Sequence, residues 1–364
     1  MILRLTKLVI YNTLIFVCLI IFLDLILGDW KNFKKDQKNN ALFPGLIKDR
    51  NIKYDARLLY DSKQEVPITY SRDENGYRSK EINSKKQIIL TIGGSTTDQR
   101  YISEGETWQD YLDDALPKFD FVNGGIDGQS TYGHTAAIKS WHSTALKQSS
   151  VKYILFYIGV NDPRLLYSKL NHYDKDQHGF ITFRSLIHQY SFIYPKLRKI
   201  LKSFSNKFES DGVINISGHG VKFKGFKNEK DGILFSGYYK ESYSFYKNLF
   251  IELINQTKKY FPQSKIIIVQ QQIPGCKFNS KYSGIDIHPY ELKDEKEICN
   301  QLASVYATQD EAIRSFNEPN KVEILPMYLQ NIIGSNDVYD YLHTNSLGSK
   351  KIGVFIHKSG VFDN

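Results

Sequence analysis

The sequence predicts an α/β protein whose core is a parallel sheet covered by helices on both sides. Two observations lead to this fold class. Five short apolar runs recur along the chain, and helical or polar segments separate them. Three of these runs end in a turn that combines glycine with a polar side chain. Strands that alternate with helices form parallel sheets, and strands buried on both faces read as unbroken apolar runs.

The apolar runs are the expected strands, and the periodic segments between them are the expected helices. The strands are Ile88–Ile92, Phe119–Val122, Val151–Ile158, Lys265–Gln271 and Val322–Leu325. The helices are Thr107–Leu116, Thr131–Leu146, Lys240–Tyr260 and Glu295–Phe316.

The first 28 residues are expected to form a membrane anchor. Leu8–Gly28 is apolar apart from Asn12, Thr13 and Asp24, and about 20 such residues cross a bilayer as a helix. No small-x-small cleavage pattern follows it, so we expect the helix to be retained. Four lysines between residues 31 and 38 oppose the positive-inside rule. Long following domains cross largely regardless of such charges, so we expect the body to lie outside the cytoplasm.

Three regions follow from this pattern. Residues 29–80 read as a linker and lead-in, of which Asp29–Ser62 is polar and rich in lysine and asparagine. Within the lead-in, Asp73–Arg78 contains an Asn-Gly turn. Residues 81–364 form the main domain. Its segment Leu165–Tyr239 has no sustained period, and we interpret it as an insertion over the carboxyl edge of the sheet that selects the substrate or caps that edge.

Charge and composition narrow the possible partners. The chain has 364 residues and a net charge of +9, from lysines spread along its length without a nucleic-acid-binding motif. We therefore expect no nucleic-acid partner, whereas attraction to anionic lipid or acidic glycan stays possible. Neither a Cys-x-x-Cys nor a His-x-x-x-His spacing occurs, so no metal or other cofactor is expected. Cys276 and Cys299 could pair in an oxidising compartment or remain free thiols.

The stretch after the first strand, Gly93-Gly94-Ser95, holds the candidate nucleophile. Glycines at a strand end allow a sharp turn, which would expose Ser95 at the carboxyl edge where open α/β folds bind ligands. Asp340 and His343 follow the last strand and are three residues apart, so on one helical turn they would share a face. A serine needs an imidazole to take its proton, and the imidazole needs a carboxylate to hold its tautomer.

The turns after the second and third strands hold candidate oxyanion donors. Gly128 and Asn161 lie there, and their N–H groups could join the backbone N–H of Ser95 in binding a tetrahedral oxyanion. We expect the neighbouring carboxylates of Asp98, Asp127 and Asp162 to brace or cap turns.

Four blocks in this order resemble the SGNH (GDSL-type) hydrolase family. They are Gly93-Gly94-Ser95-Thr96-Thr97-Asp98, Gly128, Gly159-Val160-Asn161-Asp162 and Asp340-Tyr341-Leu342-His343. The resemblance covers Gln87 to the C-terminus apart from the insertion, and Gly94 departs from the Asp usual at that position. Membrane-anchored members also carry Gly-Gly-Ser. The Asp73–Arg78 stretch resembles a lead-in of anchored members thought to act on cell-surface glycans.

The resemblance implies a flavodoxin-like three-layer α/β/α domain with five parallel strands. It implies that Ser95 is the nucleophile, His343 the base, Asp340 its orienting carboxylate, and Ser95, Gly128 and Asn161 the oxyanion hole. The implied activity is cleavage of a carboxylic ester, such as an O-acetyl group on a cell-envelope glycan, through an acyl-enzyme. The alternatives are an O-acyltransferase that uses the same residues and a non-catalytic glycan-binding protein.

Overall fold

The computed structural model describes most of the chain, and the fold below concerns those residues. They are residues 2–31, 33, 46–60, 62–78, 82, 85–146, 150–163, 165, 186–187, 190–194, 196–197, 240–274, 276, 297–316, 321–340 and 342–363. Most of the expected insertion at 165–239, including its middle, lies outside this set, so its predicted role stays a prediction.

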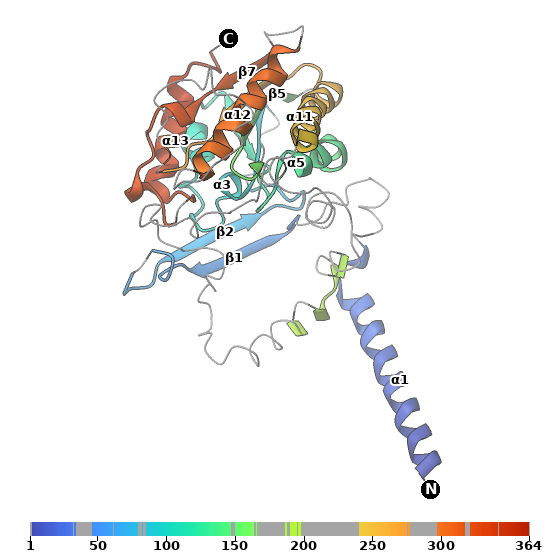
Figure 1. The fold of residues 1–364 in the computed structure, drawn as a ribbon. Helices are drawn as coiled ribbons and strands as arrows, with labels where there is room; N and C mark the ends of the chain where they lie inside the picture. Colours follow the sequence, from blue (N-terminus) through green and yellow to red (C-terminus); the bar gives the residue numbers. More distant parts are fainter. Residues whose placement is uncertain are drawn as a thin grey trace.

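A five-stranded parallel sheet forms the centre of the body (Figure 1). The strands are β3 (Gln87–Gly93), β4 (Phe119–Asn123), β5 (Val151–Ile158), β6 (Lys265–Gln270) and β7 (Val322–Leu325). They lie in the order β4-β3-β5-β6-β7, and every neighbouring pair is parallel. The first of them in the sequence therefore lies between the second and third, which is the order of flavodoxin-like folds. The predicted sheet is confirmed, and each strand ends within one residue of its expected bounds.

Helices cover both faces of the sheet (Figure 1). They are α4 (Trp108–Ala115) and α13 (Ser346–Lys358) on one face, and α5 (Thr131–Ala137), α11 (Lys240–Tyr260) and α12 (Glu297–Arg314) on the other. Successive side chains of β3 enter opposite cores: Leu90 and Ile92 pack toward α5 and α11, whereas Ile89 packs toward α4 and α13. This alternation buries the strand on both faces, which explains its unbroken apolar run.

Two helical regions differ from the sequence prediction. The expected helix Thr131–Leu146 is interrupted by a π-helical turn, Ile138–His142, before the short helix α6 (Ser143–Ala145). The π turn places Trp141 and His142 inside, where the Trp141 ring stacks on Tyr77 with 4.9 Å between ring centroids. Helix α13 was not predicted, although Asn345 is a regular N-cap whose side chain accepts a hydrogen bond from the Gly348 N–H.

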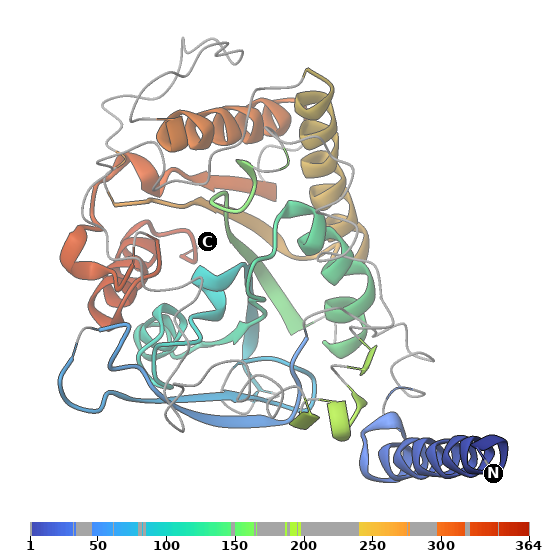
Figure 2. The same cartoon turned by 60° about the horizontal axis from the view of Figure 1, so that its bottom comes forward.

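The lead-in contains a folded hairpin, which corrects the interpretation of Asp29–Ser62 as a linker or loosely packed segment. Strands β1 (Arg50–Asp55) and β2 (Pro67–Arg72) pair antiparallel beneath the sheet (Figures 1 and 2). Ala56, Leu59 and Ile68 form a small core of their own with Tyr339 from the main domain. In β1 the exposed Asn51 and Lys53 alternate with the half-buried Ile52 and Tyr54, and two apolar residues are too few to indicate a strand. The body therefore begins before residue 81, and the hairpin is part of it.

Helix α1 (Ile2–Leu27) extends away from the body (Figures 1 and 2). Its segment Thr6–Leu27 has a mean hydropathy of 2.5 and no buried share, and is long and apolar enough to cross a membrane. At its last turn the Asp24 carboxylate accepts hydrogen bonds from the Ser191 hydroxyl (2.9 Å) and the Ile193 N–H (2.8 Å). The indole N–H of Trp30 donates to the other Asp24 oxygen at 3.2 Å. The one carboxylate within the apolar helix is thus bonded to the body.

Candidate active site

Ser95 lies at the carboxyl end of β3, where the strand turns directly into the short helix α3 (Ser95–Asp98). The turn requires glycine at position 93, because a Cβ there would lie 2.1 Å from the Thr97 hydroxyl and 2.5 Å from the Tyr157 carbonyl oxygen. Ser95 is half-buried, unlike the buried residues on either side of it. As the first residue of a helix, its N–H has no intrahelical partner and points out from the positive end of the peptide dipoles.

Asp340 and His343 meet at this same edge after β7. His343 Nε2 lies 2.7 Å from Ser95 Oγ, and His343 Nδ1 lies 2.6 Å from Asp340 Oδ2. The helical turn predicted for the pair is wrong, because the two residues lie in a tight turn outside any helix. In that turn Asp340 Oδ1 accepts hydrogen bonds from the N–H groups of Leu342 (2.8 Å) and His343 (2.6 Å). One carboxylate therefore folds the turn with one oxygen and orients the imidazole with the other.

The Asp340 carboxyl is kept in its charged form. Burial opposes the charge, but the hydrogen bond and positive character of the His343 ring, together with the two backbone N–H donors, hold its pKa below the usual value. A charged carboxylate fixes the proton of the imidazole on Nδ1 and leaves Nε2 free to accept a proton. The ring of Tyr339 stacks on the His343 ring at 5.6 Å with only 7° between the planes, so the imidazole is also held by packing.

Asn161 reaches the nucleophile turn from the end of β5. Its Nδ2 donates to the Gln129 carbonyl oxygen at 2.8 Å, which joins the turn after β5 to the turn after β4. Gly128, the residue before Gln129, has a φ of +72°, a conformation that favours glycine. A Cβ at Gly94 would lie 2.3 Å from Asn161 Nδ2, so the side chain of Asn161 fills the space that an aspartate would need. A side chain at position 94 would therefore displace the Asn161 amide from the position that it has here.

The sequence blocks therefore meet at one edge of the sheet. Ser95 follows β3, Asn161 follows β5, and Asp340 and His343 follow β7. This arrangement is a five-stranded parallel α/β fold with a serine, a histidine and an aspartate at one sheet edge. The strand order and the Ser95–His343–Asp340 geometry both match the fold that the resemblance implied.

The three neighbouring carboxylates have separate surroundings. Asp162 accepts hydrogen bonds from the N–H and hydroxyl of Thr131, both at 2.8 Å, and thereby caps helix α5 from outside. Asp127 is exposed and lies 3.7 Å from Arg100. Asp98 is fully buried and forms an ion pair with Arg72. It also accepts a hydrogen bond from the Tyr70 hydroxyl at 2.8 Å and lies 3.2 Å from Arg100. Burial opposes its charge, but the surrounding arginines hold the pKa of Asp98 below the usual value.

Sequence reasoning missed the arginines that support the nucleophile helix from the hairpin side. Arg72, at the end of β2, is buried and also donates to the Gly125 carbonyl oxygen at 2.6 Å. Arg78 donates to the carbonyl oxygens of Asp98 (2.7 Å) and Gln99 at the end of α3, and to that of Ile102 (2.5 Å) in the loop that follows. The signal was present as two arginines on either side of the Asn-Gly turn, which was interpreted only as a turn.

Other polar candidates lie away from the nucleophile. His142 is buried against Tyr77, whose hydroxyl lies 3.0 Å from its Nδ1, and burial lowers its pKa to about 3. It is therefore a neutral core residue. Among the described residues, no group of three or more His, Cys, Asp or Glu side chains is placed to hold a metal ion.

Comparison with known proteins gives similarity at the level of three-dimensional structure. No protein-family model and no curated protein matches the chain. Among solved structures, a member of the lipolytic protein G-D-S-L family from Veillonella parvula is 13% identical, with 76% of this chain and 99% of that chain covered and a TM-score of 0.39. A Clostridium thermocellum family 3 carbohydrate esterase is 14% identical, with 77% and 97% covered and a TM-score of 0.39. Phospholipase A1 from Streptomyces albidoflavus is 9% identical, with 75% and 99% covered and a TM-score of 0.37.

Proposed function

We propose that the protein is a serine esterase that cleaves a carboxylic ester through an acyl-enzyme. The observation that carries the proposal is the continuous chain of short contacts from Ser95 Oγ through both nitrogens of His343 to Asp340. A hydroxyl 2.7 Å from an unprotonated imidazole nitrogen can lose its proton as it attacks. The half-buried position of Ser95 leaves the oxygen open to a substrate.

In the proposed reaction, Ser95 Oγ attacks the ester carbonyl carbon while His343 Nε2 takes the hydroxyl proton. The Asp340 carboxylate stabilises the imidazolium that forms. The N–H groups of Ser95 and Gly128 and the Nδ2 of Asn161 bind the oxyanion of the tetrahedral intermediate. As the carbon–oxygen bond breaks, His343 returns the proton to the leaving alcohol. Water, deprotonated by His343, then attacks the acyl-Ser95; as the bond to Ser95 Oγ breaks, His343 returns that proton to Oγ and the carboxylic acid leaves.

We propose that the ester is on a glycan of the cell envelope. A cluster of tyrosine rings beside the base supports a saccharide subsite, because flat aromatic faces stack on sugar rings. Buried Tyr339 stacks on His343, and the half-buried rings of Tyr60 and Tyr101 have their centroids 5.6 Å and 6.3 Å from that of Tyr339. In the proposed reaction His343 protonates the leaving alcohol. The alcohol part of an ester bound at Ser95, here the sugar, would therefore lie beside His343.

We further propose that α1 is a retained anchor and that the body lies outside the cytoplasm. The apolar segment Thr6–Leu27 is longer than the apolar region of a typical signal peptide, and its removal would break the bonds of Asp24 to Ser191 and Ile193. A disulfide between Cys276 and Cys299 supports the outside location, because disulfides persist in oxidising compartments. Protease added to cells after permeabilisation of the outer layer should remove the body. Full protection of the body there would contradict this placement.

The activity is tested with the full-length protein in detergent on 4-nitrophenyl acetate, on longer 4-nitrophenyl esters, and then on acetylated glycans. We expect hydrolysis of the acetyl ester and release of acetate from the glycan, both absent in Ser95→Ala. Product analysis with a second sugar present separates hydrolysis from transfer: a new acylated sugar in place of free acetate would mean an acyltransferase. Glycan binding without any Ser95-dependent turnover would mean a non-catalytic binding protein.

A further inference from the structure

Gln271, the first residue after β6, has a buried side chain at the same sheet edge as the catalytic residues. Its exposed fraction is 2%. Its Oε1 accepts a hydrogen bond from the Val160 N–H at 3.0 Å, and its Nε2 donates to the Thr96 hydroxyl at 2.5 Å. Thr96 follows the nucleophile Ser95 in the chain, and Val160 precedes Asn161.

These two bonds cross from one strand end to another. Strand β5 lies between β3 and β6 in the sheet, so the Gln271 side chain reaches from β6 past the end of β5 to the turn after β3. A single amide group therefore joins the segment that carries the Ser95 N–H to the segment that carries the Asn161 amide. Both groups are oxyanion donors in the proposed reaction.

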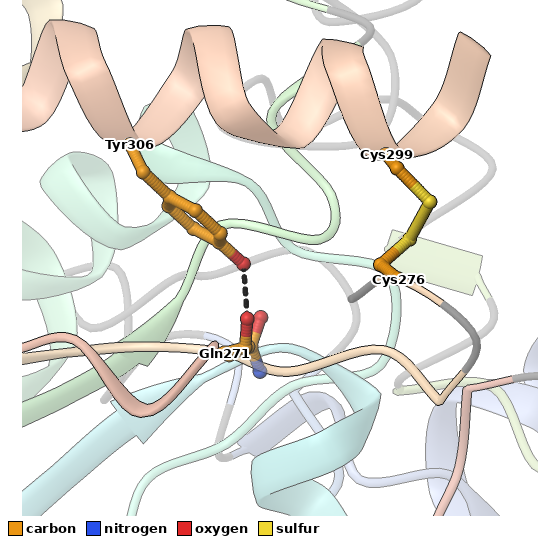
Figure 3. Close-up of a disulfide and its surroundings, with 4 residues drawn as sticks. All are labelled: Gln271, Cys276, Cys299 and Tyr306. Atoms are coloured by element: carbon orange, nitrogen blue, oxygen red, sulfur yellow. Dashed lines mark hydrogen bonds between the residues drawn. A yellow bond between two sulfur atoms is a disulfide. The ribbon is translucent and has the colours of Figure 1, made fainter. Parts of the chain in front are cut away.

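Tyr306 of α12 fixes the main chain of Gln271. Its hydroxyl donates to the Gln271 carbonyl oxygen (Figure 3). Its ring packs on Gly159, where a Cβ would lie 2.3 Å from the ring carbon Cε1, and Gly159 has a φ of +132°. Tyr306 thus contacts the turn that bears Asn161 directly and also holds the residue that braces this turn.

The disulfide adds a second attachment between α12 and the segment after β6. Cys299 and Tyr306 project from the same helix toward this segment, where Cys276 and Gln271 lie (Figure 3). The segment is therefore fixed to α12 at two points, and the Gln271 side chain is held against a rigid support.

We propose that Gln271 is a positioning residue that sets the distance between the two oxyanion donors, and that Tyr306 holds it in place. The proposal rests on the esterase function proposed above. Oxyanion donors stabilise the transition state only when they are fixed in advance, and a misplacement of about 1 Å can cost about 10²-fold in rate. Loss of the bridge should therefore lower kcat and leave KM nearly unchanged.

The test measures kcat and KM of the full-length protein in detergent on 4-nitrophenyl acetate. Gln271→Met keeps the length of the side chain and removes both hydrogen bonds, and we expect it to lower kcat about 10- to 100-fold. In an Asn161→Ala background the same substitution should cost less than about 3-fold, because the donor that it positions is already absent. Tyr306→Phe removes only the hydroxyl and should show the same coupling to Asn161→Ala with a smaller loss.

Gln272→Met is the matched control. Gln272 is the next residue, is also buried, and accepts hydrogen bonds from the N–H groups of Ile332 (2.9 Å) and Ile333 (3.1 Å), on another segment. Its substitution should lower the thermal midpoint as much as Gln271→Met does. In the double variant the fold-decrease in kcat should equal the product of the fold-decreases of Gln272→Met and Asn161→Ala measured separately.

Two results would overturn the positioning role while the esterase function stands. One is an unchanged kcat in folded Gln271→Met; the other is an equal cost of Gln271→Met with and without Asn161. If Gln271→Met fails to fold, Tyr306→Phe decides by the same two criteria. A wild-type protein without Ser95-dependent hydrolysis would instead overturn the esterase function, and the positioning role with it.

Discussion

The two sides of Ser95 are built in different ways. On the base side, one turn of four residues carries both Asp340 and His343, and the carboxylate that orients the ring also folds the turn. On the oxyanion side, the proposed donors come from the ends of three strands, and hydrogen bonds of Asn161 and Gln271 hold those ends together. The base side is local in the sequence, whereas the oxyanion side depends on the whole sheet edge.

This difference predicts how substitutions spread. A change on the base side should act on the proton transfers and leave the rest of the edge in place. A substitution on the oxyanion side should displace residues at the ends of other strands, because each proposed donor is held by residues from another strand. The following experiments separate these two behaviours, from the largest expected effect to the smallest.

The largest loss is expected for Ser95→Ala and His343→Ala. Each should lower kcat on 4-nitrophenyl acetate by several orders of magnitude, because the two groups act as one unit in forming the acyl-enzyme. The double variant should be no worse than either single variant. A circular dichroism spectrum and a thermal midpoint like those of the wild type are the control for folding. Near wild-type turnover in either purified variant would remove the triad assignment.

Asp340→Asn should lower kcat by about 10⁴-fold, because an amide does not enforce the productive tautomer of the imidazole. The Asn oxygen can still accept from the Leu342 and His343 N–H groups, so the turn should persist. Asp340→Ala removes both functions and should lower the thermal midpoint as well. Equal stability of the two variants would contradict the folding role of the carboxylate.

Asn161→Ala should lower kcat by about 10²- to 10³-fold and change KM little, because the amide acts mainly on the oxyanion. Initial rates over a range of 4-nitrophenyl acetate concentrations separate the two constants. A variant whose only defect is a raised KM would mean that Asn161 binds the substrate in its ground state.

Gly94→Ala tests whether a substitution in the turn after β3 displaces the Asn161 amide in the turn after β5. The new methyl group would lie 2.3 Å from Asn161 Nδ2, so the amide must move, and we expect kcat to fall about 10-fold or more. Gly334→Ala is the control, because a Cβ there meets only the Asp337 carboxylate at 3.6 Å. Equal kcat for both alanine variants would show that the amide tolerates the displacement.

The smallest effect is expected on stability in acid. The pKa of Asp98 in the folded protein lies below its ordinary value. At a pH above the ordinary value its ion pairs therefore stabilise the fold, and this stabilisation is lost as the pH falls through the folded-state pKa. Urea unfolding of the wild type from pH 6 to pH 3 should therefore show a steeper fall in the free energy of unfolding than Asp98→Asn shows. Parallel curves for the two proteins would contradict the charged state of Asp98.

The contrast between the two sides also explains what could be predicted from the sequence. Asp340 and His343 could be paired because they are three residues apart, follow the last strand and complete the four blocks of the family resemblance, even though a turn and not a helix joins them. Ser95, Gly128 and Asn161 could be placed because each follows a buried strand. Gln271 also follows a strand, but a glutamine carries no chemical signature of its own, and its two partners lie 175 and 111 residues away in the chain.

The lead-in was harder to predict for a different reason. Its hairpin has short strands with few apolar residues, and its stability depends on ion pairs and hydrogen bonds with the nucleophile segment. Arg72 and Asp98 are 26 residues apart, so nothing local connects them. The same holds for the rings of Tyr60 and Tyr339, which come from opposite ends of the chain.

Arg72 and Arg78 lie on the hairpin side of residue 81 but bond to the segment after Ser95, which affects where the chain can be shortened. A protein trimmed to residues 81–364 would keep all of the sheet and every residue of the triad, but it would leave the Asp98 carboxylate buried without Arg72. Removing one partner of a buried ion pair costs about 3–5 kcal/mol, a large part of the stability of a domain. We therefore expect a version produced without the helix to need residue 46 and all that follows, and to be more stable toward urea than residues 81–364 alone.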